Sequence, residues 1–168
     1  CIGAMIDKKG KAYPLEATAR LGYPAFFGQM ESHRGDPVVW MKALLAGDDK
    51  LKVSYDVCTA VVLAQPRYPY NCSPPELVEG NPIRVDASIE DHLHYCGVMK
   101  TKDGLETTAE LGMVATAMGK TIEKSRERVY NVIDGVHFPN MMYRDDAGEK
   151  VEKHLGDMHK HGYAEFTN

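Results

Sequence analysis

The segment 12–25, AYPLEATARLGYPA, limits the fold most, because a short apolar stretch there runs into polar residues and then into a Gly-Tyr-Pro turn. In a β-strand, residues two apart in sequence face the same side. Glu16, Thr18 and Arg20 are therefore predicted to project together from one face. The segment thus predicts a short strand that carries polar groups where it ends.

These three side chains form a chemically coherent set. A hard cation such as Mg²⁺ takes one or two carboxylates together with phosphate oxygens, and arginine offers a rigid fork for phosphate or carboxylate. Glu16, Thr18 and Arg20 are therefore suited to hold a metal-bound anion. The alternative is a strand end whose polar side chains face water. Both interpretations remain open on the residues alone.

The first part of the chain is predicted to be a hairpin followed by a helix. Strands are predicted over residues 2–6 and 12–18, on either side of an Asp-Lys-Lys-Gly turn. Asp36 is a suitable N-cap and Pro37 occupies the favoured first helical position. The apolar stripe that follows stops at Gly47. The polar stretch after this glycine marks the expected boundary between two parts.

The second part mixes strands with one well-delimited helix. The apolar run 59–64 predicts a central strand, and segments 91–99 and 107–118 predict two further extended segments. Thr121 as N-cap and Gly135 as terminator enclose a helix with one apolar face. Strands around a helix, joined by hairpins, indicate an α+β fold rather than a parallel sheet.

Residues 16–25 resemble the signature of phosphoribosylamine–glycine ligase (glycinamide ribonucleotide synthetase), an ATP-grasp enzyme of purine synthesis. That family reads Glu-x-Asn-x-Arg-x-Gly-Asp-Pro-Glu, and four positions of this chain match it: Glu16, Arg20, Gly22 and Pro24. Further segments resemble the family in the same order along the chain: 3–10, 60–69, 114–121 and 142–148. Their collinear order is more specific than any single motif.

The resemblance implies a domain organisation. Residues 1–47 would end an ATP-grasp domain, and residues 48–148 would form a C-terminal α+β domain with a small mixed or antiparallel sheet and packed helices. Residues 149–168 would be a charged tail that can form a helix. The upstream nucleotide-binding half of such an enzyme is missing from this sequence. The resemblance therefore implies a C-terminal fragment that is inactive as an isolated chain.

The resemblance also implies a reaction and a site. ATP, glycine and 5-phosphoribosylamine would give glycinamide ribonucleotide, ADP and phosphate, so the partners are small molecules and the missing N-terminal half. Glu16 and Thr18 would contact ATP and bind Mg²⁺ or Mn²⁺, and Arg20 would contact the substrate as the catalytic arginine. The alternative for Arg20 is an ion pair with Glu16 on the surface.

This chain departs from the family at motif positions. Thr18 replaces an amide, and Tyr23 and Ala25 replace two acids. Residues 109–111 stand where the family carries Gly-Gly-Arg, so a cation is missing and Glu110 would repel the substrate phosphate. An alternative function is therefore a diverged relative, non-catalytic or with an altered substrate, that acts as a binding or assembly module.

Two smaller patterns complete the candidate residues. Arg144 and Asp146 match the closing motif of the resembled family and are interpreted as an ion pair that pins the final turn. His92 and His94 are predicted to lie on one side of a strand, a spacing compatible with a zinc or other metal site.

Composition excludes two classes of partner. The net charge of −4 argues against a nucleic-acid-binding surface. The longest apolar runs are too short to cross a bilayer, which argues against a membrane protein. Four widely spaced cysteines without a Cys-x-x-Cys pair indicate reduced thiols in a cytoplasmic protein. The sequence leaves open whether the protein is a monomer or a dimer.

Overall fold

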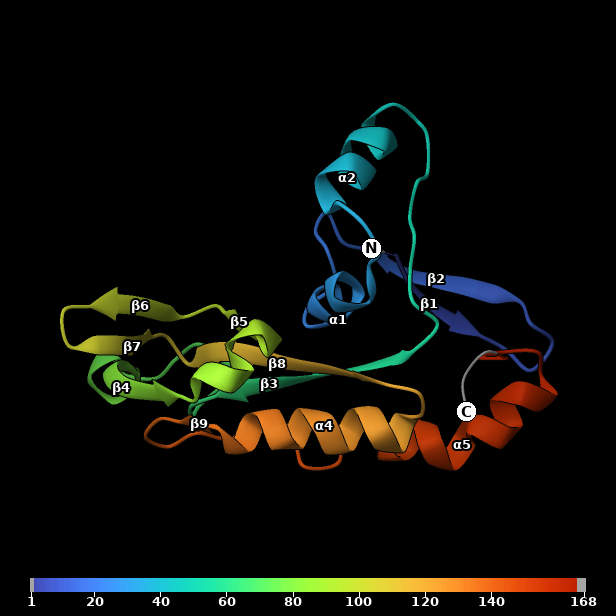
Figure 1. Ribbon diagram of the computed structural model, residues 1–168. Coiled ribbons are helices and arrows are strands. Elements are labelled where there is room, and N and C mark those ends of the chain that lie inside the picture. The colour runs from blue at the N-terminus through green and yellow to red at the C-terminus, as the bar shows by residue number, and fades with distance from the viewer. Residues whose placement is uncertain (1, 166–168) are drawn as a thin grey trace.

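A three-stranded antiparallel sheet lies at the centre of the molecule (Figure 1). In the computed structural model, which describes residues 2–165, its strand order is β3 (Val57–Ala64), β8 (Leu111–Gly119) and β5 (Leu93–Tyr95). Residues 112–117 of β8 are all buried. The central strand is therefore β8, and the prediction that the run 59–64 is central was wrong, because β3 forms one edge of this sheet.

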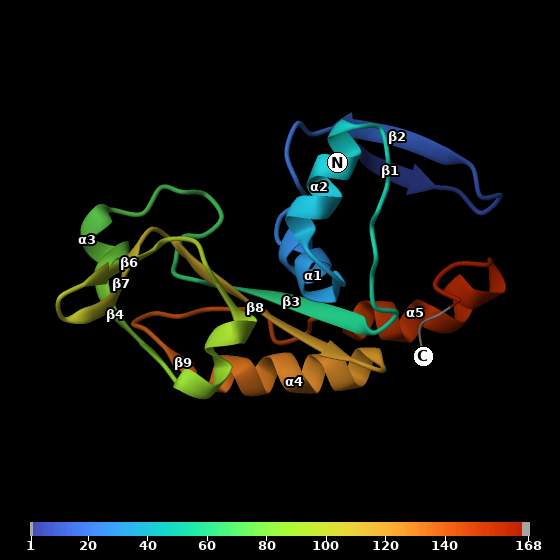
Figure 2. The same cartoon turned by 45° about the horizontal axis from the view of Figure 1, so that its top comes forward.

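Helices cover both faces of the central sheet (Figures 1 and 2). Helix α4 (Ile122–Asp134) lies under one face, and α1 (Ala25–Ser32) lies over the other. Alternate residues of β3 serve the two sides: Val61 and Leu63 join the core that includes α4, whereas Cys58 and Ala60 lie near Gly28 of α1. The period-two pattern of this strand thus builds two separate packing surfaces.

Helix α4 begins and ends where its capping residues predict. The Thr121 hydroxyl accepts a hydrogen bond from the backbone of Lys124 at 3.1 Å, and Gly135 follows the last turn. The strand before the helix passes very close to it. A β-carbon built on Gly119 would contact the Ser125 backbone nitrogen and lie 2.7 Å from the carbonyl carbon of Lys124. Only glycine fits this approach without displacing backbone.

A second antiparallel sheet extends the molecule away from α1. Its order is β6 (Val98–Thr101), β7 (Gly104–Thr108), β4 (Glu79–Val85) and β9 (Val136–His137). A short helix α3 (Pro75–Val78) precedes β4, and a 3₁₀ helix η1 (Ala87–His92) follows it. Antiparallel sheets packed with helices confirm the α+β class.

Two predicted extended segments are each broken in the structure. Segment 91–99 divides into the end of η1, then β5, then β6, and segment 107–118 divides at Ala109 and Glu110 between β7 and β8. The cause is the passage of the chain from one sheet to the other. The Gly97 amide donates to the Leu111 carbonyl at 3.0 Å, and a β-carbon on Gly97 would lie 2.9 Å from that of Ala109.

The N-terminal region has the elements predicted from its sequence. Strands β1 (Ile2–Ile6) and β2 (Ala12–Ala17) form an antiparallel hairpin, and α2 (Pro37–Leu45) is capped by Asp36, which accepts from the Val38 amide at 2.8 Å. The tail forms helix α5 (Glu149–Lys160), as its amphipathic pattern predicts. In Figure 1 the hairpin and α2 stand apart from the central sheet.

Large apolar side chains of this N-terminal region are exposed. In the hairpin the exposed fraction reaches 74% at Ile2 and 66% at Leu15, and in α2 it is 54% at Val38 and 90% at Leu45. The stripe that predicts α2 as an amphipathic helix is therefore not covered within residues 2–165. Surfaces of this kind mark interaction sites.

Two sequence expectations concern cysteines and membranes. Cys58, Cys72 and Cys96 are unpaired thiols, as predicted, and Cys1 lies outside the described residues. Among the helices of residues 2–165, none has both the length and the apolar character needed to span a bilayer.

Candidate functional site

The predicted site residues lie where β2 leaves the hairpin. Strand β2 ends at Ala17, so the alternation argument applies to Glu16 alone, while Thr18 follows the strand and Arg20 lies in a bend. The Thr18 hydroxyl donates to the Arg20 carbonyl at 3.5 Å, and the Arg20 guanidinium donates to the Leu21 carbonyl at 3.2 Å. The three residues thus share one short segment, but only Glu16 is held by strand pairing.

Glu16 has the exposure that a metal ligand at an open site requires. It pairs with Gly3 across the hairpin, and its side chain is exposed. Within residues 2–165, no group of three or more His, Cys, Asp or Glu side chains could hold a metal ion. Glu16 and Thr18 can therefore supply one carboxylate and one hydroxyl, a partial set that fits Mg²⁺ only when phosphate oxygens and waters complete it.

A row of rings anchors the segment after Arg20 onto the C-terminal part of the chain. The Tyr23 ring meets Phe27 edge to face at a centroid distance of 5.7 Å, and Phe27 stacks on His94 at 4.7 Å. The Tyr23 hydroxyl lies 3.8 Å from the Cys96 sulfur. Burial, followed by the proximity of Cys96, raises the pKa of Tyr23. The stretch that links Arg20 to α1 is therefore fixed against β5.

A polar network joins α1 to the central sheet. The Thr116 hydroxyl lies 3.2 Å from a carboxylate oxygen of Glu31 and 3.0 Å from Nε2 of His94. The Thr116 hydroxyl also lies 3.4 Å from the His92 carbonyl, a second acceptor for its single hydrogen. Burial lowers the pKa of His94, and the charge of Glu31 opposes that shift. Nδ1 of His92 lies 3.5 Å from Glu31.

This network replaces the metal site suggested by the two histidines. His92 ends η1 and His94 lies in β5, so the two residues do not share one strand face. Their acidic neighbour is Glu31, which lies 61 or more positions earlier in the chain. No local pattern around Glu31 could have revealed the contact, because it depends on how α1 is placed over the sheet.

Glu110 is buried, with 4% of its surface exposed, and it holds a loop. Its carboxylate accepts backbone hydrogen bonds from Asn71 at 2.9 Å, Cys72 at 2.8 Å and Ser73 at 2.7 Å. Desolvation opposes ionisation, but the hydrogen bonds from Ser73, Asn71 and Cys72 prevail and lower the pKa of Glu110. These hydrogen bonds leave the negative charge of the carboxylate in place, so the expectation that Glu110 would repel a substrate phosphate stays a prediction.

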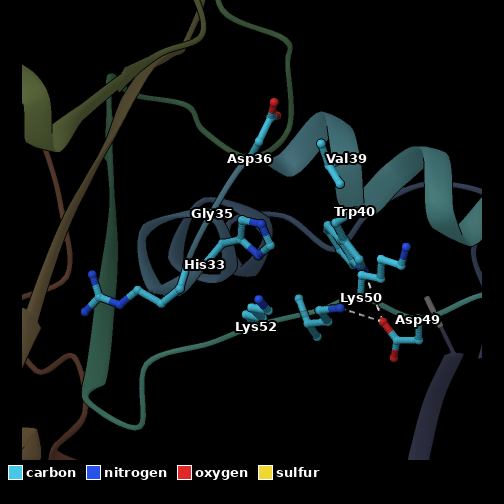
Figure 3. A pocket seen from close by; sticks show the side chains of 10 residues that line it. His33, Gly35, Asp36, Val39, Trp40, Asp49, Lys50 and Lys52 are labelled. Atoms are coloured by element: carbon cyan, nitrogen blue, oxygen red, sulfur yellow. Dashed lines mark hydrogen bonds between the residues drawn. The ribbon is translucent and has the colours of Figure 1, made fainter.

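A cavity of about 430 Å³ opens between α2 and the segment that follows it (Figure 3). The Trp40 ring lies 5.5 Å from that of His33, and its indole N–H donates to Asp49 at 3.3 Å. Lys50 and Lys52 also line the cavity. Sequence reasoning missed this feature, although the single tryptophan near two lysines is visible in the sequence. The cavity is lined by residues 33–36, 39–40 and 49–52.

The closing motif is a structural element, as predicted. The Arg144 guanidinium donates to both carboxylate oxygens of Asp146, from Nε to Oδ1 at 2.8 Å and from Nη2 to Oδ2 at 2.5 Å. The Tyr130 hydroxyl donates to the Arg144 carbonyl at 2.9 Å and accepts from the Ala147 amide at 3.0 Å. This turn is therefore pinned to α4.

Comparison with known families identifies the central part of the chain. Residues 58–150, which comprise both sheets and α4, match the family model described as phosphoribosylglycinamide synthetase, C domain. The chain belongs to this family. The synthetase C domain thus begins at β3 and ends at the start of α5.

The sequence similarity between this chain and curated relatives extends beyond residues 58–150. The phosphoribosylamine–glycine ligase of Vibrio cholerae is 29% identical over 152 residues, and that of Pseudomonas putida is 30% identical over 153 residues. Each alignment covers 89% of this chain and 35% of the relative. The chain therefore spans about a third of the length of these curated relatives.

A solved structure has the same fold. The phosphoribosylamine–glycine ligase of Thermotoga maritima superposes with a TM-score of 0.73, covering 86% of this chain and 35% of that one at 24% sequence identity. The coverage of this chain extends well beyond the 93 residues between 58 and 150 that match the family. The synthetase C domain and part of its flanking segments therefore share an arrangement with that ligase.

Proposed function

We propose that this chain is the C-terminal portion of an ATP-dependent carbon–nitrogen ligase of purine biosynthesis. The reaction would be that of phosphoribosylamine–glycine ligase, in which ATP, glycine and 5-phosphoribosylamine give glycinamide ribonucleotide, ADP and phosphate. The observation that carries this proposal is the position of Glu16. It is an exposed carboxylate at the end of β2, immediately before the segment that packs onto the synthetase C domain.

The proposal includes a division of the chain. Residues 1–47 would end an ATP-grasp domain, residues 48–148 would form the C-terminal domain, and residues 149–168 would be a helical tail. The alignment covers 35% of the Vibrio cholerae relative, and the part of such a ligase that lies outside it would supply the nucleotide-binding half. The exposed apolar side chains of the β1–β2 hairpin and α2 support this assignment, because an ATP-grasp domain would need them as part of its core.

The residues at the end of β2 have roles in this proposal. Glu16 and Thr18 would hold Mg²⁺ or Mn²⁺, and Arg20 would contact the substrate as the catalytic arginine. The bound ion would neutralise charge on the nucleotide phosphates. The side chains position and neutralise rather than attack, so no protein nucleophile is required. A cytoplasmic location, expected from the separate cysteines, is part of the same proposal.

A second candidate is a non-catalytic or altered relative that binds or assembles. Thr18 offers a neutral hydroxyl where the family has an amide, and Tyr23 and Ala25 lack the charges of two acids. The engagement of Glu110 with the loop 71–73 favours this candidate as well, because it alters a position at which the family has glycine.

A chimera can decide between the two candidates. The part of the Vibrio cholerae ligase that precedes the aligned region would be joined to this chain, and glycine-dependent ADP release would be measured with 5-phosphoribosylamine present. The ligase proposal predicts turnover by the chimera and none by the 168-residue chain alone. A chimera that folds and binds ATP but releases no ADP would favour the non-catalytic candidate.

Glu16→Gln in this chimera is expected to reduce turnover by roughly 100-fold, because an amide lacks the charge that holds a divalent cation against phosphates. Raising the Mg²⁺ concentration should recover part of the loss. Glu123→Gln, at an exposed position in the first turn of α4, is the matched control and should leave turnover unchanged. Equal turnover of the Glu16 variant and its parent would remove Glu16 from the site.

A further inference from the structure

Three successive backbone amides converge on one carboxylate in the loop before α3. The amides of Asn71, Cys72 and Ser73 donate to the two oxygens of Glu110 at 2.9, 2.8 and 2.7 Å. Asn71 adopts a positive φ of 51°, which turns consecutive N–H groups toward the same side. Consecutive amides arranged in this way form a nest, a concave site for an anion.

We infer that residues 71–73 form an anion-binding nest for a small carboxylate, and that Glu110 is its built-in occupant. The carboxylate is excluded from solvent, and each of its hydrogen bonds is charge-assisted. Because Glu110 belongs to the same chain, its local concentration exceeds that of any dissolved anion. An external carboxylate can therefore enter only when the Glu110 side chain is absent or displaced. This inference does not depend on the proposed ligase function.

The frame of the nest does not depend on the Glu110 side chain. The Ser73 hydroxyl donates to the Pro66 carbonyl at 2.8 Å and accepts from the Arg67 amide at 2.7 Å, which closes the loop on itself. The backbone of Glu110 is held separately, since its carbonyl accepts from the Gln65 amide at 2.7 Å. Loss of the carboxylate should thus leave the three donors close to their present positions.

The Gln65 side chain fixes the other end of the same loop. Its amide nitrogen donates to the Val78 carbonyl at 3.0 Å and to the Ala109 carbonyl at 3.2 Å. Its oxygen accepts from the Asn81 side chain at 2.7 Å. Gln65 is fully buried, so these contacts form a rigid support beneath the loop. The support makes an unoccupied nest stable enough to test.

Glu110→Ala removes a CH₂ group and the carboxylate, which are the atoms that acetate replaces. We expect the variant to melt several degrees below the parent, because three amides lose their acceptor. Sodium acetate should restore the melting temperature saturably, with an apparent dissociation constant on the order of 10 mM. Sodium chloride at equal ionic strength should not restore the melting temperature. The amide NMR signals of residues 71–73 should shift when acetate is added.

Three comparisons make the experiment decisive. The parent chain and Glu76→Ala, a change of an exposed carboxylate in α3, should show no saturable acetate response. Glu110→Gln, which keeps the shape of the side chain, should exclude acetate. If Glu110→Ala fails to fold, refolding yield against acetate concentration becomes the readout. A variant that responds to acetate and chloride alike, or that acetate does not help to refold, overturns the inference.

Discussion

Replacing Gly119 by alanine is expected to lower the free energy of unfolding by about 3 kcal/mol. The added β-carbon would contact the Ser125 backbone nitrogen and would lie 2.7 Å from the Lys124 carbonyl carbon and 2.9 Å from the Ser125 α-carbon. These are backbone atoms in the first turn of α4, so no side-chain rotation can relieve the overlap. The helix must move away from β8, and urea unfolding followed by circular dichroism measures the cost.

Gly156→Ala is the matched control for this substitution. Gly156 lies within α5, and a β-carbon there would meet no atom within 4 Å. Alanine in a helix interior is more favourable than glycine by roughly 0.5–1 kcal/mol, so this variant should be slightly more stable than the parent. Similar unfolding curves for the two alanine variants would contradict the close approach of β8 to α4.

Leu63→Ala is expected to cost about 2–5 kcal/mol, since it removes a fully buried side chain and leaves a cavity. Leu63 has 0% of its surface exposed and belongs to the core cluster that includes Val129 and Ile133 of α4. Neighbouring side chains on β8 are held by strand pairing and cannot collapse freely into the space. The loss should appear as a lower urea midpoint with a nearly unchanged slope.

Leu45→Ala makes the same chemical change at the end of α2, where 90% of the residue is exposed. Its effect on this chain should stay within about 0.5 kcal/mol. A large loss at Leu45 would mean that the apolar face of α2 is covered in solution, as it would be in a second copy of the chain or another partner. Sedimentation of the parent chain would then identify the contact.

Local elements could be predicted from the sequence because their determinants lie within a few residues. The Asp-Lys-Lys-Gly turn places the hairpin, and Asp36 with Pro37 places the start of α2. Thr121 and Gly135 enclose α4. Each of these signals acts through one or two backbone hydrogen bonds, and no distant contact competes with it.

Long-range features could not be predicted in this way. An apolar run predicts a buried strand without stating which neighbours it pairs with, so β3 and β8 could not be ranked. The link from Glu31 to Thr116 spans 85 positions, and that from Asn71 to Glu110 spans 39. Nothing near either glutamate distinguishes it from a solvated one. The family resemblance marked Glu110 as unusual, but its burial depends on the loop that comes to meet it.

The placement of β8 has a kinetic consequence for hydrogen exchange. Residues 113–115 of this strand pair with β3 on one edge and with β5 on the other, and the strand is covered by α1 on one face and α4 on the other. Releasing only one neighbouring strand leaves residues 113–115 paired with the other, so their amides should exchange with deuterium only through global unfolding. Amides of the β1–β2 hairpin, which is paired with nothing beyond itself in the described chain, should exchange through far less costly fluctuations. Deuterium uptake would thus divide this one polypeptide into a slow centre and a fast N-terminal flank.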